Sequence, residues 1–139
     1  MSGKDGKQFD VICLGRAGVD LYADQIGARL EDASSFSKYI GGSSCNIAAG
    51  SSRLGLKSSM LTRVGDDQMG RFIREQLEKE GVDVSHVKSD PERLSGLVLL
   101  GIKDKDTFPL LFYRENCADM AIDEKDFDED YIKKAKALL

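Results

Sequence analysis

Short apolar runs alternate along this chain with longer segments in which apolar residues recur at helical spacing. Residues 9–14 (FDVICL) form a continuous apolar run that ends at Gly15, which is typical of a strand buried on both faces. Residues 59–64 predict a second strand. Residues 21–25 and 35–40 mix polar with apolar positions, so they indicate exposed strands or loops.

The clearest helical pattern covers residues 69–80. Its apolar residues share one face, oppositely charged residues stand four positions apart, and Gly81 follows as a stop signal. Residues 46–54 predict a shorter helix, which Gly55 ends as a glycine C-cap. Each of these helices adjoins a predicted strand.

The carboxyl-terminal third predicts a hairpin and a last helix. Residues 97–102 and 109–113 are strand-like runs joined by the polar turn KDKDT, which favours an antiparallel pair. Over residues 131–139, apolar residues return at helical spacing. Asp126 or Asp128 is available as the N-cap of this helix.

The order of these elements predicts the fold class. Strand, helix, strand and helix in succession, with inserted hairpins, indicate an α/β sheet built through right-handed crossovers. The chain stops on two leucines after the last predicted helix, where such a fold enters its next strand, so we expect an incomplete sheet. We expect residues 1–8 to be a disordered leader and residues 9–139 to fold.

Composition and charge restrict the classes of function. The 139 residues contain 20 basic and 24 acidic side chains, a formal net charge of -4, and no basic stripe, which argues against nucleic acid as a partner. No window approaches the roughly 18 apolar residues of a membrane span, and no secretion signal precedes the first strand, so we expect a cytoplasmic protein. The three cysteines have no metal-ligand spacing and are expected to be reduced thiols.

Candidate chemistry gathers in the segment GGSSCNIAAGSSRLG, residues 41–55. Gly41 and Gly42 precede a predicted helix, where the backbone can approach a ligand closely and free N–H groups are available. Asn46, in or just before the first turn, can both donate and accept hydrogen bonds, which suits sugar hydroxyls. The alternative is a structural glycine turn with Asn46 as N-cap, and this segment alone favours neither.

The segment GGSSCNIA, followed by GDDQMG at residues 65–70, resembles the first signature of the ribokinase-like carbohydrate kinases, also called the phosphofructokinase B family. The resemblance implies a three-layer α/β sheet with a small β lid formed by inserted strands. It also implies that Asp20, at the end of DVICLGRAGVD, binds sugar hydroxyls. Ser44 departs from the pattern, because the family usually has Pro, Ala or Gly there.

Four further segments resemble the members of this family that phosphorylate sugar acids: GRAGVDLYADQIG, FSKYIGG, RLGLKSSMLTRVGDDQMGRFIREQLEKEGVDVS and FPLLFYRENCADMA. This resemblance implies lid strands at about residues 21–40 and 97–114, with Tyr113 and Arg114 touching the substrate. A guanidinium can hold a carboxylate by two hydrogen bonds, so Arg114 suits a sugar acid; the alternative is a solvated surface arginine. Because lid strands in this family often pair two subunits, we also expect a homodimer.

The family's catalytic base is an aspartate in a glycine-rich turn far toward the carboxyl end, and the sequence contains no Gly-x-Gly-Asp. We interpret Asp66 and Asp67, which follow Gly65, as capping or packing residues. The resemblance implies that a complete kinase uses ATP and magnesium, held by its remaining carboxyl-terminal part. We therefore expect no catalytic residue, metal ligand or bound cofactor in this chain.

Three interpretations stay open. The chain is part of a sugar-acid kinase, a non-catalytic module that binds a sugar acid, or a half-domain that acts with a partner chain. We favour the first, because an apolar end and half a sheet suit an independent sensor poorly.

Two other features have a structural and a chemical interpretation. Cys45 at a helix start could be an activated thiolate, but the only histidine, His86, lies in a predicted polar loop with no partner, so we favour a packing cysteine. The acidic run at residues 119–130 suits a solvated helix start better than a cation site.

Overall fold

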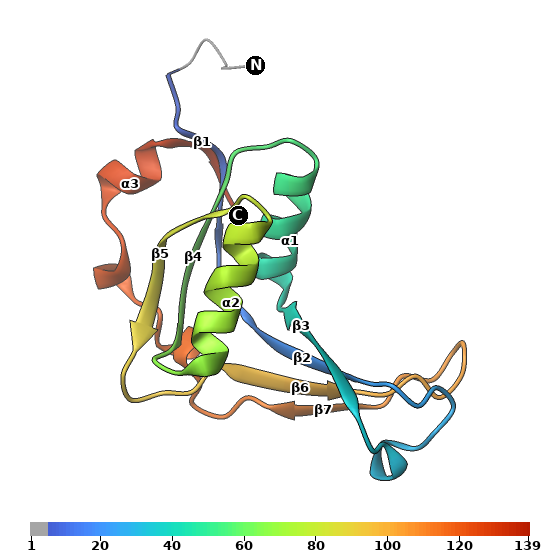
Figure 1. The fold of residues 1–139 in the computed structure, drawn as a ribbon. Coiled ribbons are helices and arrows are strands. Elements are labelled where there is room, and N and C mark those ends of the chain that lie inside the picture. The colour runs from blue at the N-terminus through green and yellow to red at the C-terminus, as the bar shows by residue number, and fades with distance from the viewer. Residues whose placement is uncertain (1–5) are drawn as a thin grey trace.

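The computed structural model describes residues 6–139, which form two four-stranded sheets (Figure 1). The central sheet has the order β5-β4-β1-β8, and all its pairs are parallel. Its strands are β1 (Phe9–Leu14), β4 (Ser58–Gly65), β5 (Asp83–Asp90) and β8 (Ala135–Leu138). The leader expected over residues 1–8 falls largely outside the described residues.

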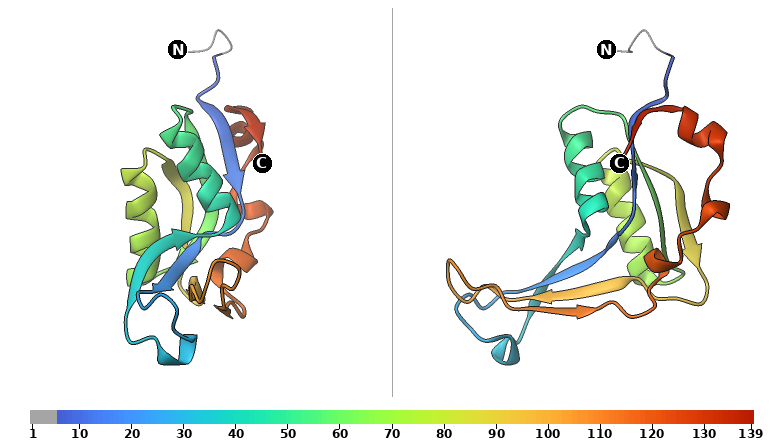
Figure 2. Two further views of the ribbon diagram at one scale, coloured as in Figure 1. Left: turned by 90° about the vertical axis from the view of Figure 1, so that its right-hand side faces the viewer. Right: turned by 180° about the vertical axis from the view of Figure 1, so that it is seen from behind.

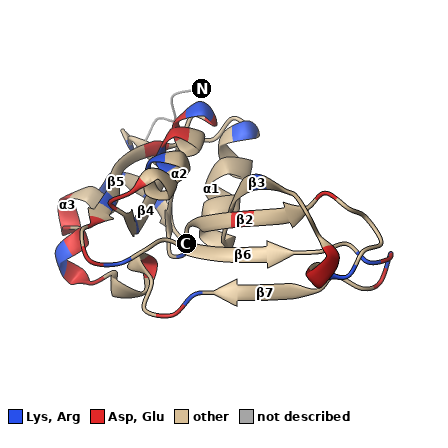
Figure 3. Cartoon of the chain, turned by 60° about the horizontal axis from the view of Figure 1, so that its bottom comes forward, with Lys and Arg blue, Asp and Glu red and all other residues tan. Residues whose placement is uncertain are grey.

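The second sheet, which we call the lid sheet, projects from one end of the central sheet (Figures 1 and 2). Its order is β3-β2-β6-β7, with strands β2 (Gly18–Ala23), β3 (Phe36–Gly41), β6 (Gly96–Leu100) and β7 (Leu110–Tyr113). The β6 and β7 strands are antiparallel, which confirms the predicted hairpin. Figure 3 shows no charge on these two strands. The four residues of β7 are exposed, but pairing of subunits through the lid stays a prediction.

Helices cover both faces of the central sheet (Figure 2). On one face lie α1 (Ser43–Arg53) and α2 (Gln68–Lys79). Across the other face run the 3-10 turns η2 (Ala118–Ala121) and η3 (Glu124–Asp126) and the short helix α3 (Glu129–Lys133). This arrangement confirms the predicted α/β fold. Within the described part of the chain, no helix is long and apolar enough to cross a membrane.

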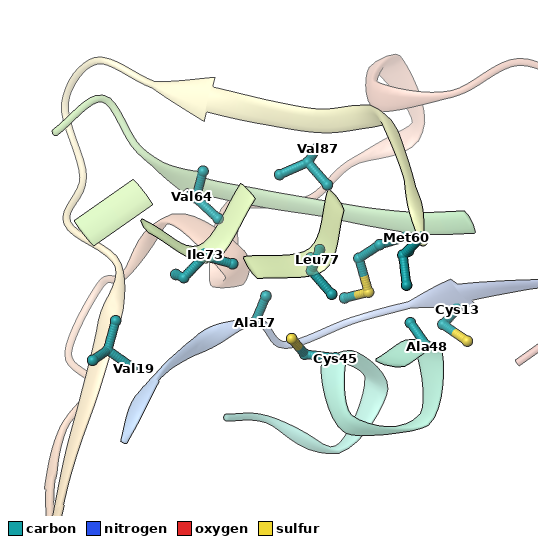
Figure 4. Packing of buried hydrophobic residues seen from close by; sticks show 11 residues of the cluster. Cys13, Ala17, Val19, Cys45, Ala48, Met60, Val64, Ile73, Leu77 and Val87 are labelled. Atoms are coloured by element: carbon teal, nitrogen blue, oxygen red, sulfur yellow. The ribbon is translucent and has the colours of Figure 1, made fainter. Parts of the chain in front are cut away.

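The main core lies between the central sheet and the two longer helices (Figure 4). Met60 of β4 and Leu77 of α2 are fully buried there, and the small side chains of Cys45 and Ala48 let α1 pack closely against Cys13 of β1. Burial raises the pKa of the Cys45 thiol to about 12, so it is protonated at neutral pH. The sulfur therefore packs and is not an activated thiolate.

Capping residues explain where the two longer helices begin. The Asp67 side chain accepts a hydrogen bond from the Gly70 N–H at 2.9 Å at the start of α2, which confirms its interpretation as a capping residue. The α1 helix begins at Ser43, three residues before the predicted start, because Gly42 serves as its N-cap. Asn46 consequently lies inside the first turn of α1 and is not its cap.

The predicted helix over residues 131–139 is wrong beyond Lys133. The Asp128 carboxylate does cap α3, accepting from the Tyr131 N–H at 2.7 Å, but the chain then leaves the helix and forms β8. This strand pairs with β1, whose backbone N–H and C=O groups would otherwise lack partners on that side. The long-range pairing outweighs a local helical pattern only two turns long.

The predicted polar loop around His86 is also wrong, because this residue lies on β5. The His86 ring stacks on the Tyr131 ring with centroids 3.4 Å apart and planes 9° apart. The Tyr131 hydroxyl in turn shares a 2.8 Å hydrogen bond with Ser59 of β4. The alternation of polar residues along β5 suits an edge strand, and β5 lies at the edge of the central sheet with β4 as its neighbour.

Arg63 of β4 ties η3 to the central sheet. Its Nε and Nη2 atoms donate to the two carboxylate oxygens of Asp126 at 2.7 and 3.0 Å, and Asp90 lies 3.5 Å from Nη1. The side chain of Asp126 is only 2 % exposed. Burial alone would raise the pKa of Asp126, but the Arg63 hydrogen bonds reverse that effect and the pKa falls below its ordinary value.

We predict that Arg63→Met lowers the free energy of unfolding by about 3 kcal/mol, because it takes both guanidinium hydrogen bonds from the buried Asp126 and leaves it only Lys88 and the Asp123 N–H. Urea denaturation measures the loss. As a matched control, Arg29→Met breaks the solvent-exposed pair with Asp32 and should cost less than about 1 kcal/mol. Equal losses in the two variants would contradict the structural role of the Arg63 pair.

Candidate substrate site

Three glycines lie side by side across the lid sheet. Gly41 of β3 pairs with Gly18 of β2, which pairs with Gly96 of β6. We call this line of bare backbone the glycine row. Neighbouring strands are about 4.8 Å apart, so the row spans roughly 10 Å from Gly41 to Gly96. Without side chains, it leaves room for groups that reach over it from neighbouring positions.

Charged side chains lie over the two ends of the glycine row. The Asp20 carboxylate rests against Gly41, in the space that a Cβ at that position would need. At the other end, the Arg114 Cγ atom lies 3.5 Å from where a Cβ of Gly96 would be. The Asp20 carboxylate thus lies at the Gly41 end of the row and the stem of Arg114 at the Gly96 end.

Asp20 and Asn46 line the same hollow, which has a volume of about 560 Å³. Among the described residues, no group donates a hydrogen bond to the Asp20 carboxylate and none bonds to the Asn46 side chain amide. Burial raises the pKa of Asp20, and the positive charge of Arg16 opposes this rise only in part. Both side chains are thus free to bind hydroxyl groups of a ligand.

Gly42 fixes the position of α1 relative to this hollow. Its φ is 102°, and a Cβ there would overlap the carbonyl oxygen of Arg16. That oxygen accepts from the Cys45 N–H at 3.3 Å, and the Gly42 oxygen accepts from the Asn46 N–H at 2.8 Å. The close approach of the two backbones, which only glycine permits, delivers Asn46 to the hollow.

Ser44, the departure from the family pattern, has a local role in this turn. Its hydroxyl donates at 2.8 Å to the carbonyl oxygen of Leu14, the last residue of β1. The serine therefore strengthens the connection between β1 and the start of α1.

Four of the six residues expected at the site, Asp20, Gly41, Gly42 and Asn46, lie around the Gly41 end of the glycine row, whereas Tyr113 and Arg114 line a second hollow of about 760 Å³ beside Gly96. Tyr113 pairs with Leu97, in the register row next to that of Asp20. Because side chains alternate between the faces of a sheet, Tyr113 lies on the face opposite to Asp20. Phe112 lies on the same face as Asp20. A substrate contact through Tyr113 stays a prediction.

Sequence reasoning missed two parts of the site. Gly18 and Gly96 complete the glycine row. In the sequence, each is only a glycine before an apolar run, and nothing there indicates that the two are paired. Arg16 was missed as well: its guanidinium lies 6.0 Å from the centre of the Phe112 ring, and its charge acts on Asp20. No local pattern distinguishes Arg16 from a surface arginine.

The fold is a parallel α/β sheet, covered by helices, that carries a projecting lid sheet with a row of glycines at its base. Residues 8–139 match the family described as pfkB family carbohydrate kinase, and the chain belongs to that family.

Two curated relatives with the same name illustrate the similarity. The chain is 46% identical over 134 residues to the 5-dehydro-2-deoxygluconokinase of Geobacillus kaustophilus (strain HTA426), covering 96% of this chain and 40% of that protein. It is 43% identical over 137 residues to the 5-dehydro-2-deoxygluconokinase of Shouchella clausii (strain KSM-K16), covering 98% and 42%. The chain thus spans about two fifths of the length of these relatives.

Solved structures agree with the fold. A PfkB protein from Polaromonas sp. JS666 is similar with a TM-score of 0.85 and 35% identity, over 94% of this chain and 43% of that one. An uncharacterized sugar kinase from Pyrococcus horikoshii in complex with ATP has a TM-score of 0.85 and 30% identity, over 92% and 41%. The chain corresponds to part of the length of each.

We predict that Asp20→Asn raises the melting temperature at pH 7. The folded state raises the pKa of Asp20 and so favours its protonated form. Protonated Asp20 therefore stabilises the fold below the ordinary pKa of about 3.9, and this stabilisation is lost as the pH rises through the pKa of the folded state. The ionised carboxylate therefore costs stability at pH 7, and Asn removes that cost. Near pH 3 the difference should vanish.

Asp24, the residue directly after β2, is the matched control. A hydrogen bond from the Ser37 hydroxyl, 2.6 Å from its Oδ1, lowers the pKa of Asp24. Asp24→Asn should accordingly lower the melting temperature at pH 7, the opposite sign. Thermal denaturation of both variants between pH 3 and 7 tests this, and shifts of the same sign would contradict it.

Proposed function

We propose that this chain is the substrate-binding part of an ATP-dependent sugar-acid kinase that phosphorylates 2-deoxy-5-keto-gluconate at its 6-hydroxyl. The observation that carries the proposal is the glycine row with Asp20 over one end and Arg114 over the other. The names of the curated relatives support this choice of substrate.

Each end of the glycine row suits one part of such a substrate. The Asp20 carboxylate accepts hydrogen bonds from hydroxyl groups, and the Asn46 amide can both donate to them and accept from them. Holding several hydroxyls in place orients the one that reacts. At the other end, the guanidinium of Arg114 forms charge-assisted hydrogen bonds with the carboxylate of a sugar acid. A neutral sugar offers Arg114 no such partner.

The proposal assigns binding to this chain and phosphoryl transfer elsewhere. The sequence contains no Gly-x-Gly-Asp turn of the kind expected to carry the base, and its acidic residues after β7 serve other purposes. Asp126 pairs with Arg63, and Asp128 caps α3. In a complete kinase, ATP would supply the phosphoryl group and magnesium would neutralise its charge. The sugar kinase from Pyrococcus horikoshii has been solved in complex with ATP.

We predict that the 139-residue chain binds 2-deoxy-5-keto-gluconate without phosphorylating it. The hydroxyl and carboxylate contacts reside in this chain, whereas the proposed base does not. An NMR titration of the chain detects binding, and a coupled assay with ATP and magnesium detects turnover. Turnover by the chain alone would contradict the division of roles, and the absence of chemical-shift changes would contradict the binding site.

We predict that Arg114→Met abolishes the preference for acids. Methionine keeps the length of the apolar stem but removes the charge, so the dissociation constant of 2-deoxy-5-keto-gluconate should rise by about 10- to 100-fold, as for lost hydrogen bonds to charged groups. The dissociation constant of the neutral ketose fructose should change little. Arg29→Met, on an exposed pair far along the lid, is the control. An unchanged ratio of the two constants would remove Arg114 from carboxylate binding.

A further inference from the structure

The Arg114 side chain is held by a half-formed ion pair. Its Nη2 donates to Oδ2 of Asp119, whose side chain is only 2 % exposed. Two buried atoms of the pair, Nε of Arg114 and Oδ1 of Asp119, have no hydrogen-bond partner. They are the two atoms that a side-on bidentate pair would join. Buried polar atoms without partners are rare in folded proteins and call for an explanation.

The pair of Arg63 and Asp126 shows what the complete arrangement looks like in the same chain. There, Nε and Nη2 of the arginine donate to both carboxylate oxygens. Arg63 also lies near Asp90 and Asp123. Its donors are therefore committed to the protein, whereas most N–H groups of Arg114 are not.

Asp119 lies on a well-fixed element at the β6 end of the glycine row. The N–H of its neighbour Ala118 donates to the Leu94 carbonyl oxygen at 2.8 Å, which ties η2 to the turn before β6. The Asp119 Oδ1 atom lies 4.0 Å from the position of a Cβ on Gly96, next to the stem of Arg114. The buried carboxylate thus anchors the guanidinium beside the Gly96 end of the glycine row.

We propose that Asp119 is a positioning residue for carboxylate recognition. It holds Arg114 through Nη2 and leaves the N–H groups of Nη1 for the carboxylate of a sugar acid. An arginine fixed in this way loses less rotamer freedom when the ligand binds. The inference rests on the proposed function, because it concerns how Arg114 selects acids.

The proposal has a consequence that a purely structural role would lack. Asp119 acts on the ligand only through Arg114, and without Arg114 its negative charge repels the substrate carboxylate. Asp119→Asn should weaken acid binding in the wild-type background. In the Arg114→Met background, the same change should weaken it no further or strengthen it. Asparagine is close in shape to aspartate and is therefore the substitution of choice.

The experiment measures dissociation constants of 2-deoxy-5-keto-gluconate and fructose for the 139-residue chain by NMR titration. We expect Asp119→Asn to weaken binding of the acid by about fivefold or more, in line with loss of one charge-assisted hydrogen bond, and to leave fructose binding within about twofold. The Nε–Hε resonance of Arg114 should shift when the acid is added to the wild type. In Asp119→Asn, that resonance should exchange faster with water before the acid is added.

Asp126→Asn is the matched control, because it also removes a buried carboxylate that pairs with an arginine. It should lower the melting temperature and leave the ratio of the two dissociation constants unchanged. Asp119→Glu keeps the negative charge, so this variant should retain more of the acid preference than Asp119→Asn.

The outcomes separate this inference from the proposed function. If the wild type prefers the acid and Arg114→Met abolishes that preference, but Asp119→Asn keeps the ratio or weakens both ligands equally, the positioning role is wrong and the proposed function stands. Tighter acid binding by Asp119→Asn also overturns the positioning role. If the wild type shows no preference for the acid, the proposed function fails, and the role of Asp119 fails with it.

Discussion

The close approach of backbones at the base of the lid is the constraint on which the rest of the site depends. Gly41, Gly18 and Gly96 bring three strands together without side chains, and Gly42 lets the start of α1 reach the Arg16 carbonyl oxygen. A Cβ on Gly41 would overlap the Asp20 carboxylate, and a Cβ on Gly18 would come too close to the Gly96 carbonyl oxygen. The glycines thus create room for charged groups to lie over a bare backbone floor.

The site and the core make opposite use of buried charge. Asp126 gains two hydrogen bonds from Arg63, and its pKa falls in spite of burial. Asp20 lies in a partly buried position without such bonds among the described residues, and its pKa rises. The first arrangement stabilises the fold, whereas the second leaves an acceptor with unmet hydrogen-bonding capacity. Such unmet capacity is what a ligand can satisfy.

Local patterns predicted the parts of the fold that local interactions decide. The amphipathic face and the cap of α2, the glycine stop after α1 and the β6–β7 hairpin all follow from residues close in sequence. The β8 strand and the position of His86 depend on pairing with strands more than 20 residues away, so no local pattern could identify them. At the candidate site, the resemblance of motifs singled out Asp20, Asn46 and Arg114, whereas only the register shows that Tyr113 lies on the face of the sheet opposite to Asp20.

Residue type alone does not separate a structural arginine from one that binds a ligand. Arg63 and Arg114 each pair with a buried aspartate that lies further along the chain, and both segments look equally polar in sequence. The difference is the number of donors that the protein itself uses. Arg63 has three aspartates around its guanidinium, whereas the pair of Arg114 with Asp119 through one nitrogen fixes the guanidinium and leaves Nη1 available. The pair of Arg114 and Asp119 is therefore the more informative one, because it fixes the guanidinium through Nη2 and leaves Nη1 without a partner in the described part of the chain.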